Sequence, residues 1–411
     1  MGLTCGIDWA EDHHDVAIVD ESGNVLAERR IGVGAAGFAE LLGVLAECGD
    51  RMDQLIPVAI ENSGLLLVAA LLAGGRKVYA INPLAVSRYR DRHRASRAKS
   101  DARDAIILAN ILRTDAHAHR PMPTDSDAVK ALRVLTRAQQ DAVWDRVGLT
   151  NRIRGALRRY FPAAIAAFER GGKHRLDSAA CRVILCTAPT PSVASKLSLA
   201  RLQALLRRAG RSRGIDAEAR RLQTFLRRVE LRQRPEVEDA MGIHLQTLLH
   251  QLDAICDAVG VLTAAAEQLF LAHRSAAIIT SMPGAGPLTG ARLLAEIGDD
   301  ANRFSDARAL KAYAGAAPIT RDSGKSHHVS YRRAKNDRIA SAGYAWVRAA
   351  LLHDLACRTY YQRRRRNGDR HVGAQRNLFN KLLGKLYHCL QTGELYDAAA
   401  AFSDHPVPIT A

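Results

Sequence analysis

The chain has few of the features that mark secreted, membrane-spanning or zinc-cluster proteins. Its 411 residues include 7 cysteines, an odd number with no Cys-x-x-Cys pair, so neither a disulfide framework nor a cysteine-bound zinc site is expected. The best apolar run, 65–73, is far shorter than the ~20 residues of a spanning helix. Acids stand near the N-terminus (MGLTCGIDWAEDHHD), where a signal peptide needs bases. We therefore expect a protein of a reducing cytoplasm with no membrane partner.

Aromatic residues are also scarce, whereas positive charge is in excess. Aromatics make up 5% of the chain, which gives no evident stacking platform for single-stranded nucleic acid. Lys and Arg total 59 against 42 Asp and Glu, a net charge of +17. The apolar fraction of 47% excludes a largely disordered chain, and the length predicts two or three domains. A polyanion, above all nucleic acid, is the first partner to consider.

The first hundred residues alternate strand and helix patterns. Strands are predicted at 3–9, 15–19, 25–31, 56–60 and 77–81, with helices at 38–45 and 65–72. A further helix is predicted to open at Ser100. This order of elements predicts a mixed α/β sheet domain.

The middle of the chain is predicted to be helical. The long Arg-rich segment 125–160 ends at Pro162, and 202–231 and 244–271 also have helical patterns. In the last of these, one face carries leucines (Leu245, Leu248, Leu249 and Leu252), which is typical of a packing face in a bundle or coiled coil. We predict four parts: an α/β domain 1–122, a helical linker 123–275, a mostly helical C-terminal domain 276–396 and a tail 397–411.

Four acids stand out in the N-terminal domain. Asp8 interrupts an apolar strand, where an ionised side chain is costly unless a partner or metal meets it. Glu61 closes the strand IPVAIEN, and Asp101 and Asp104 share one face at a helix start. Two-metal phosphodiester chemistry needs carboxylates that converge on hard cations such as Mg²⁺. The simpler alternatives, that Asp101 only favours the helix macrodipole and that Asp104 is an exposed helix acid, stay open for each residue alone.

The order of these motifs resembles the RuvC-like, RNase H-fold domain of the DEDD transposases of insertion-sequence family 110, with its 1111 and 116/902 relatives. The matching motifs are GID, a hydrophobic hairpin, IEN, NP and AKSDARDA. The resemblance implies that Asp8, Glu61, Asp101 and Asp104 bind two Mg²⁺ ions, with Mn²⁺ as a substitute.

The C-terminal region carries two further motifs, and a Gly- and Ser-rich loop is expected between SMPGAGPLTGARLLAEIGD and the helical segments that run to about residue 395. SMPGAGPLTGARLLAEIGD resembles a helix–hairpin–helix whose glycines, Gly284 and Gly286, would expose N–H groups to a phosphate. The string Ala-Gly-x-x-Pro followed by Ser-Gly resembles the C-terminal transposase domain of the same family and maps its nucleophilic serine onto Ser323. A serine beside a glycine is more often a simple turn residue, so this role rests on the resemblance. The segment around Asn336 departs from the commoner family pattern.

Basic residues lie beside both candidate sites. They are expected to contact phosphates, which position nucleic acid without reading its sequence. They are Arg90, Arg92, Arg94, Arg97 and Lys99 before the acidic helix, and Lys325, Arg332, Arg333, Lys335 and Arg338 after the serine.

The function predicted from these features is that of a transposase or recombinase of an insertion sequence. The resemblance implies strand exchange through a covalent 5′-phosphoserine, guidance by an element-encoded bridge RNA, a homo-oligomer (dimer or tetramer) with a composite active site, and a bacterial, nucleoid-associated location. Two alternatives stay open. One is a metal-dependent structure-selective endonuclease, like a Holliday-junction resolvase, which forms no covalent intermediate. The other is a non-catalytic nucleic-acid-binding scaffold.

Overall fold

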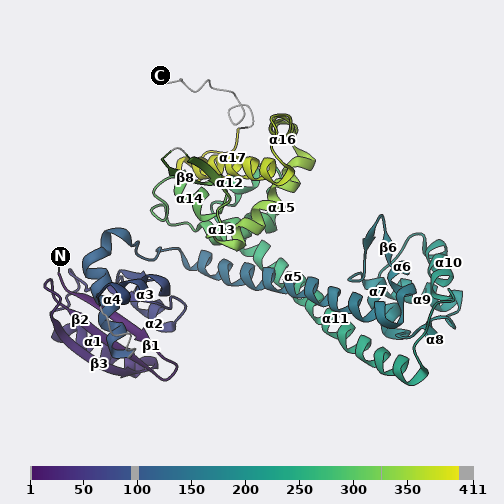
Figure 1. Ribbon diagram of the computed structural model, residues 1–411, viewed down its shortest axis with the longest axis horizontal. Coiled ribbons are helices and arrows are strands. Elements are labelled where there is room, and N and C mark those ends of the chain that lie inside the picture. The colour runs from purple at the N-terminus through teal and green to yellow at the C-terminus, as the bar shows by residue number, and fades with distance from the viewer. Residues whose placement is uncertain (1, 94–100, 325, 398–411) are drawn as a thin grey trace. The chain divides into compact units, whose positions relative to one another are not determined.

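The computed structural model describes residues 2–93, 101–324 and 326–397 (Figure 1). Four of the basic residues predicted to contact phosphate lie outside this part of the chain, namely Arg94, Arg97, Lys99 and Lys325. The chain divides into two compact units, Met1–Thr124 (unit 1) and Asp125–Ala411 (unit 2). Each unit is described by itself.

Unit 1 is built on a five-stranded mixed sheet with the strand order β3-β2-β1-β4-β5. The first three strands form an antiparallel meander, and β4 and β5 continue the sheet in parallel with β1. The predicted mixed α/β domain is confirmed. Its elements are β1 (Thr4–Trp9), β2 (His13–Val19), β3 (Val25–Gly32), α1 (Gly34–Glu47), β4 (Val58–Ile60), α2 (Leu66–Ala73), β5 (Val78–Ala80), α3 (Pro83–His93), α4 (Asp101–Asp115) and a 3₁₀ turn at Ala116–Ala118.

Helices cover both faces of this sheet. On one face, Cys5 and Ile7 of β1 are fully buried in a core shared with α1 and α2. Because successive strand residues point to opposite faces, Thr4, Gly6 and Asp8 point to the other face. There α4 packs directly on β1, and Ala59 of β4 shares a core with Leu108 of α4. The candidate acids therefore belong to the face that α4 covers.

Unit 2 consists of helices with two small hairpins. Its elements are α5 (Asp127–Tyr160), α6 (Pro162–Ala167), β6 (Glu169–Arg170), β7 (Lys173–His174), α7 (Ala179–Thr187), α8 (Pro191–Ala194), α9 (Leu199–Arg208), α10 (Ile215–Leu226), α11 (Pro235–Leu271), α12 (Ala276–Ser281), α13 (Pro287–Ile297), α14 (Ala307–Tyr313), β8 (Ile319–Ser323), β9 (Ser326–Ser330), α15 (Asp337–His353), α16 (Leu355–Arg366) and α17 (His371–Thr392).

The long helices α5 and α11 run side by side in opposite directions, and each end of the pair carries a separate core (Figure 1). At one end, Leu149 and Ile153 of α5 pack with Leu245 and Leu252 of α11 and with the helices of 161–234, which we call the head. At the other end, Val129 and Leu132 enter the core of α12–α17, which we call the C-terminal cluster. The leucine face predicted for 244–271 is buried as expected, between Leu245 and Leu252.

The structure refines one sequence-based expectation for unit 2 and overturns another. The segment 202–231 is not one helical stretch, because a turn that contains Gly210 and Gly214, both at positive φ, separates α9 from α10. The residues around Ser323 were expected to form a Gly- and Ser-rich loop, but they form the antiparallel hairpin β8–β9.

Among the described residues, α11 is the one helix long and apolar enough to cross a membrane, with a hydropathy of 1.5 over its apolar window. Length and composition are weak evidence, because core helices of soluble proteins pass the same test. Packing on α5 explains the apolar residues near Leu245. In the apolar window of α11, 11% is buried, and the rest is half-buried or exposed.

Candidate catalytic carboxylates and serine hairpin

Asp8 and Glu61 lie at the ends of neighbouring parallel strands. The register of β1 on β4 pairs Cys5 with Val58, Gly6 with Ala59 and Ile7 with Ile60. Extended by one residue past Ile60, where β4 ends, this register sets Asp8 beside Glu61, and residues paired in this way point to the same face. Neighbouring strands are ~4.8 Å apart, so the two carboxyl groups share one small region at the carboxyl edge of the sheet. Both side chains are half-buried.

The helix α4 is held on this face by contacts that also fix its register against β1. The hydroxyl of Thr4 donates to the carbonyl of Ala109 over 3.0 Å. A Cβ on Gly6 would stand 2.0 Å from the carbonyl oxygen of Ala105. Two residues along the strand thus correspond to four along the helix, since ~6.6 Å of strand matches ~6 Å of helix. Two more residues along β1 and four back along α4, the same register sets the backbone of Asp101 level with Asp8.

Asp104 is the one helix acid whose side chain the structure describes. Its carboxylate is buried, with 8% of the side chain exposed, and accepts a hydrogen bond of 2.6 Å from the guanidinium of Arg90 on α3. A buried carboxylate needs such a cationic partner, because removing it from water is otherwise costly. The side chain of Asp101 lies outside the described part. Arg90, predicted to contact phosphate, therefore contacts one of the candidate metal ligands.

Sequence reasoning missed a fifth acid beside this group. Asp15 of β2 pairs directly with Asp8 across the antiparallel ladder. Its side chain is 7% exposed and is held by Arg30 through two hydrogen bonds of 3.0 Å. The available signal was the same as for Asp8, namely an acid inside an apolar strand. Because Arg30 engages both carboxylate oxygens and balances their charge, Asp15 is not counted in the candidate ligand set.

The residue types at this site fit a hard divalent cation. All four candidate ligands are carboxylates, the donors that Mg²⁺ and Mn²⁺ prefer over nitrogen or sulfur. In this structure, the cationic partner of Asp104 is the guanidinium of Arg90. Among described side chains, no group of three or more His, Cys, Asp or Glu is close enough to hold a metal. Thus Asp8 and Glu61 are brought together, whereas Asp104 is held by Arg90.

The candidate nucleophile lies at the tip of the β8–β9 hairpin in unit 2. Ser323 is the last residue of β8, is exposed, and pairs with Ser326 across a turn in which Gly324 has φ +52°. The hydroxyl of Ser326 donates to the carbonyl of Ser323 over 3.1 Å. Asp322, also exposed, immediately precedes the serine. The hairpin thus presents the serine hydroxyl where a large substrate can reach it.

The Ala-Gly-x-x-Pro motif anchors this hairpin to the C-terminal cluster. Gly315 has φ +70°, and a Cβ there would meet the Lys335 side chain at 2.2 Å, so both conformation and space favour glycine. The N–H of Asn336 donates to the carbonyl of Tyr313 over 2.8 Å, which ties the start of the motif to the segment after the hairpin. The motif therefore positions the strands that carry Ser323.

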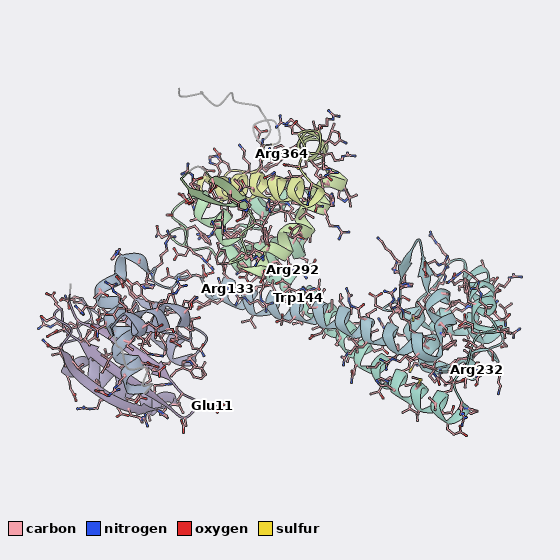
Figure 2. The ribbon with its side chains drawn as sticks, in the orientation of Figure 1. Glu11, Arg133, Trp144, Arg232, Arg292 and Arg364 are labelled. Atoms are coloured by element: carbon pink, nitrogen blue, oxygen red, sulfur yellow. The ribbon has the colours of Figure 1, made fainter. Side chains whose placement is uncertain are left out.

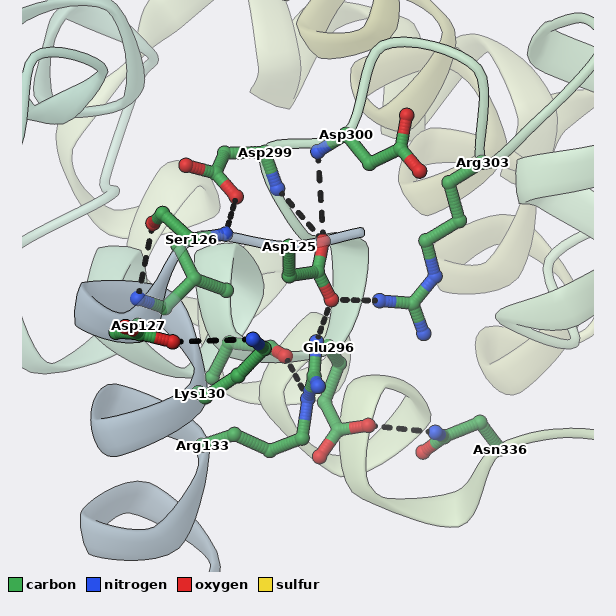
Figure 3. A network of polar contacts seen from close by, with 12 residues as sticks. Asp125, Ser126, Asp127, Lys130, Arg133, Glu296, Asp299, Asp300, Arg303 and Asn336 are labelled. Atoms are coloured by element: carbon green, nitrogen blue, oxygen red, sulfur yellow. Dashed lines mark hydrogen bonds and ion pairs between the residues drawn. The ribbon is translucent and has the colours of Figure 1, made fainter. Parts of the chain in front are cut away.

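Asn336 itself has a structural role (Figure 3). Its side-chain oxygen caps α15, and its amide donates to Glu296 over 2.7 Å. Glu296 is almost fully buried and also forms an ion pair of 2.7 Å with Arg137 of α5. Burial alone raises the pKa of Glu296, but the Arg137 and Asn336 contacts outweigh it and hold the pKa below its ordinary value. This network joins α5, α13 and α15.

A second buried acid binds the start of α5 to the same cluster (Figure 3). The carboxylate of Asp125 accepts hydrogen bonds from the N–H groups of Asp299 and Asp300 and forms ion pairs with Arg133 and Arg303. Its side chain is 1% exposed. Asp125 and Glu296 are thus structural acids, distinct from the carboxylates on the sheet.

The remaining residues predicted to contact nucleic acid have different surroundings. Arg92 and Arg333 are exposed. Lys335 is paired with Asp337, and Arg338 with Asp141 over 3.0 Å and with the ring of Trp144. Those two therefore already have partners in their own chain.

The other predicted contacts in the C-terminal region lie near turns. Arg332 is half-buried, and its Nε donates to the carbonyl of Ala317 over 3.4 Å. Gly284 has φ +73° and lies against the backbone of Ala350. This close packing explains why the position is a glycine. Gly286 is exposed at the start of α13. Their phosphate contacts stay predictions.

Two family models match the chain. One, for DEDD transposases of the IS110 type, covers residues 5–162 and is described as a transposase. The other, described as the transposase IS116/IS110/IS902 family, covers residues 276–362. The first spans the sheet with its four acids, and the second spans the serine hairpin. Residues 163–234 of the head lie between the two matches.

Curated relatives match over almost the whole chain. The mini-circle protein of IS117 from Streptomyces coelicolor, described as its candidate transposase, is 56% identical over 98% of this chain and 97% of its own length. A 43.6 kDa protein of insertion element IS110 from the same organism is 31% identical over 97% of this chain and 96% of its own. A 42 kDa protein of IS900 from Mycobacterium paratuberculosis is 29% identical over 96% of this chain.

The chain belongs to the IS110/IS116 family of transposases. It is a DNA transposase, so DNA is its substrate, and the DEDD type implies dependence on a divalent metal.

Proposed function

We propose that this transposase cuts and rejoins DNA with two chemical groups, the carboxylates of unit 1 and the serine of unit 2. The observation that carries the proposal is the register that sets Asp8 beside Glu61, with the start of α4 level with them. The strand order β3-β2-β1-β4-β5, with its antiparallel meander and parallel extension, supports an RNase H-like domain.

Asp8, Glu61, Asp101 and Asp104 would hold two Mg²⁺ ions, for which Mn²⁺ can substitute. Such ions, when bound, withdraw charge from the phosphate and from the attacking and leaving oxygens. The residues of the chain itself position the ligands and balance charge around them. Asp15 and Arg30 balance charge beside Asp8, and the contact of α4 with Gly6 fixes where the helix acids stand.

In the proposed cleavage step, the Ser323 Oγ attacks the phosphorus of a DNA phosphodiester. The Oγ–P bond forms, the bond from phosphorus to the 3′ oxygen breaks, and the DNA 5′ phosphate stays on the serine. The serine proton passes to a base, for which the neighbouring Asp322 is a candidate, and the departing 3′ oxygen takes up a proton. In the reverse direction, a 3′ hydroxyl from another strand attacks the phosphoserine and restores a phosphodiester, which completes strand exchange.

We further propose that the protein acts as a homo-oligomer, a dimer or a tetramer. The acids belong to unit 1 and the serine to unit 2, so one protomer can supply the acids and another the serine. The apolar window of α11, of which 11% is buried in the chain, supports association, since apolar surface that a chain does not bury can be covered by a second copy. We also propose that α5 and α11 pack as a coiled coil.

Target choice is proposed to depend on a non-coding RNA of the element. The basic residues of the chain contact phosphates, which carry no sequence information, so base pairing with a guide would supply it. Support for this part comes from the family resemblance. Loss of site-selective integration when the non-coding segment of the element is deleted is the expected result.

The carboxylate site is tested by cleavage of supercoiled element DNA by the purified full chain. Asp8→Asn and Glu61→Gln are each expected to lower the cleavage rate by ~100-fold or more, because a metal ligand is lost. The chelator EDTA should stop the reaction, and Mg²⁺ or Mn²⁺ should restore it. Glu11→Gln is the control, since Glu11 is an exposed acid just after β1 (Figure 2). Cleavage by Asp8→Asn at the rate of the Glu11→Gln protein would refute the site.

A further inference from the structure

The head holds an unusual share of the positive charge. Residues 161–234, all of them described, contain sixteen Lys or Arg and five Asp or Glu, a net charge of +11 out of the +17 of the whole chain. Neither of the two family models covers 163–234, so the catalytic assignments do not explain this charge.

A short hairpin projects basic side chains from this domain. β6 and β7 pair Arg170 with Lys173 across a two-residue turn, Gly171-Gly172, in which both glycines have positive φ. A Cβ at either glycine would meet no atom within 4 Å, so the tip stands free of the rest of the head. Lys173 is exposed, and half of the Arg170 side chain is exposed.

One buried acid organises the arginines at the base of the hairpin. Glu218 of α10, 9% exposed, forms ion pairs with Arg170 and with Arg221, and Arg221 also donates to the carbonyl of Ala167. Two guanidinium groups thus share a single carboxylate. Burial and the nearby charges of Arg221 and Arg211 lower the pKa of Arg170, which agrees with cations crowded more closely than their acids can balance.

The turn between α9 and α10 extends the same basic surface. Gly210 and Gly214, with φ of +81° and +60°, bracket the exposed Arg211 and Arg213. The Nε of Arg211 donates to the carbonyl of Arg213 over 2.9 Å, which fixes the shape of the turn. Arg207, in the last turn of α9, is exposed just before it.

We infer that this surface, the head surface formed by Arg170, Lys173, Arg207, Arg211 and Arg213, is a second DNA-binding site that grips the phosphate backbone of duplex DNA. Guanidinium and ammonium groups on a hairpin and a neighbouring helix turn suit the two phosphate rows that border a groove. The narrow hairpin, with Lys173 next to its turn, matches the minor groove, ~6 Å wide, where Arg and Lys are favoured.

Two observations select duplex DNA. The three aromatic residues of the head are unavailable for stacking on single-stranded bases, because Phe161 and Phe168 are buried and the ring of Phe225 lies under Arg228 at 4.0 Å. DNA is the substrate that membership of a DNA transposase family assigns to the chain.

The head surface is separate from the serine hairpin. The C-terminal cluster packs on α5 near Leu132 and the head packs on it from Leu149 onward. The intervening 17 residues of helix span ~25 Å at 1.5 Å each. Binding at the head surface would thus hold DNA at a distance from the point of cleavage and lengthen the duplex that each protomer engages.

The test is the affinity of the full chain for a 30-base-pair DNA duplex, measured by fluorescence anisotropy between 50 and 200 mM salt. The protein carries Asp8→Asn throughout, so that the result does not depend on the proposed chemistry. The triple variant Lys173→Gln/Arg211→Gln/Arg213→Gln is expected to bind roughly tenfold or more weakly at 100 mM salt. Its log–log salt slope should fall by about 3, near 0.9 for each lost phosphate contact.

The matched control is Lys196→Gln/Arg227→Gln/Arg228→Gln. It removes the same charge from the other end of α10, where Arg227 donates to the carbonyl of Ser195 next to Lys196. Its salt slope should stay at the wild-type value. Equal losses in the two triple variants would overturn the inference. So would a loss confined to a duplex RNA of the same length, which would identify RNA as the partner.

A measurement without substitutions covers the case of a misfolded variant. In the wild-type chain, duplex DNA should protect Lys173 from acetylation by an N-hydroxysuccinimide ester more than it protects the exposed Lys196. Equal acetylation of Lys173 with and without DNA would contradict the inference.

Discussion

At the scale of single residues, Gly6 shows how a small residue sets the geometry of the candidate catalytic site. The absence of a side chain lets α4 lie on β1, where a Cβ would be 2.0 Å from one backbone atom and 2.5 Å from another. Without this close approach, the start of α4 could not stand level with Asp8. Gly6 therefore matters to the site although it carries no functional group.

Replacement of Gly6 by alanine tests this contact. Gly6→Ala must move α4 away from the strand, and we expect a loss of about 2–3 kcal/mol in the free energy of unfolding of unit 1. Gly43→Ala is the control, since a Cβ there meets no atom within 4 Å and Gly43 lies inside α1. It should be neutral or stabilising by up to ~1 kcal/mol. Thermal denaturation followed by circular dichroism measures both, and equal stability of the two variants would refute the contact.

Sequence reasoning found Asp8 and Glu61 because an acid within or directly after an apolar strand is visible in a linear pattern. It did not find that Arg90 pairs with Asp104, or that Arg30 neutralises Asp15. These partners come from different strands and helices, so only the folded sheet brings them together. The same is true of Arg338, whose contacts with Asp141 and Trp144 join α15 to α5.

At the scale of elements, buried acids fasten the long helix α5 to the C-terminal cluster. Asp125 receives two backbone N–H groups and two guanidinium groups, so its charge is fully compensated inside the protein. Figure 2 shows Arg133 and Trp144 along α5, the helix that these contacts hold.

Asp125→Asn is expected to lower the free energy of unfolding of unit 2 by about 3–5 kcal/mol, because two arginines lose their charged partner in a buried place. Asp127→Asn, two residues later, removes an exposed acid that pairs with Lys130, and should cost less than about 1 kcal/mol. Chemical denaturation compares the two. A loss of the same size for both would show that the Asp125 network contributes no more than a surface pair.

Glu296 predicts a pH dependence of stability. Its pKa in the folded chain lies below the ordinary value of ~4.3, so its ion pair stabilises fully above that pH and the contribution is lost as the pH falls through the lower, folded value. Glu296→Gln should be less stable than wild type by about 1–3 kcal/mol at pH 7. The difference should shrink steadily as the pH drops below ~4. A difference that does not change with pH would contradict this role.

Long elements were predictable from the sequence and short ones were not. The strands β1 to β3 and the helix α5 follow from apolar runs and from the stop at Pro162, because each has many residues that agree on one period. β6 and β7 have two residues each, too few to show alternation. The serine hairpin reads RDSGKSHH at its turn and shows no apolar alternation there, so its pairing depends on the anchoring of Gly315 and Asn336 in three dimensions.

At the scale of the whole molecule, the exposed apolar part of α11 predicts self-association. Val261 is 70% exposed in the middle of this helix. If the face is an oligomer interface, Val261→Glu should shift the protein from the dimer or tetramer to the monomer in sedimentation velocity, with the dissociation constant raised ~10-fold or more. Gln251→Glu adds the same charge at an exposed position of α11 that lies nearly three turns from Val261 and on a different side of the helix, and it should leave the oligomer intact. A wild-type chain that sediments as a monomer at micromolar concentration would refute the proposed interface.

The central claim is that carboxylates in one unit and a serine in the other perform one cleavage reaction. The most direct measurement is a denaturing gel of radiolabelled element DNA after reaction with the full chain and Mg²⁺. Wild type and Ser326→Ala, altered in the same hairpin, are predicted to give a covalent protein–DNA band that survives detergent, whereas Ser323→Ala and Asp8→Asn give none. A covalent band of undiminished intensity with Ser323→Ala, or cleavage by wild type with no covalent band at all, would contradict the account.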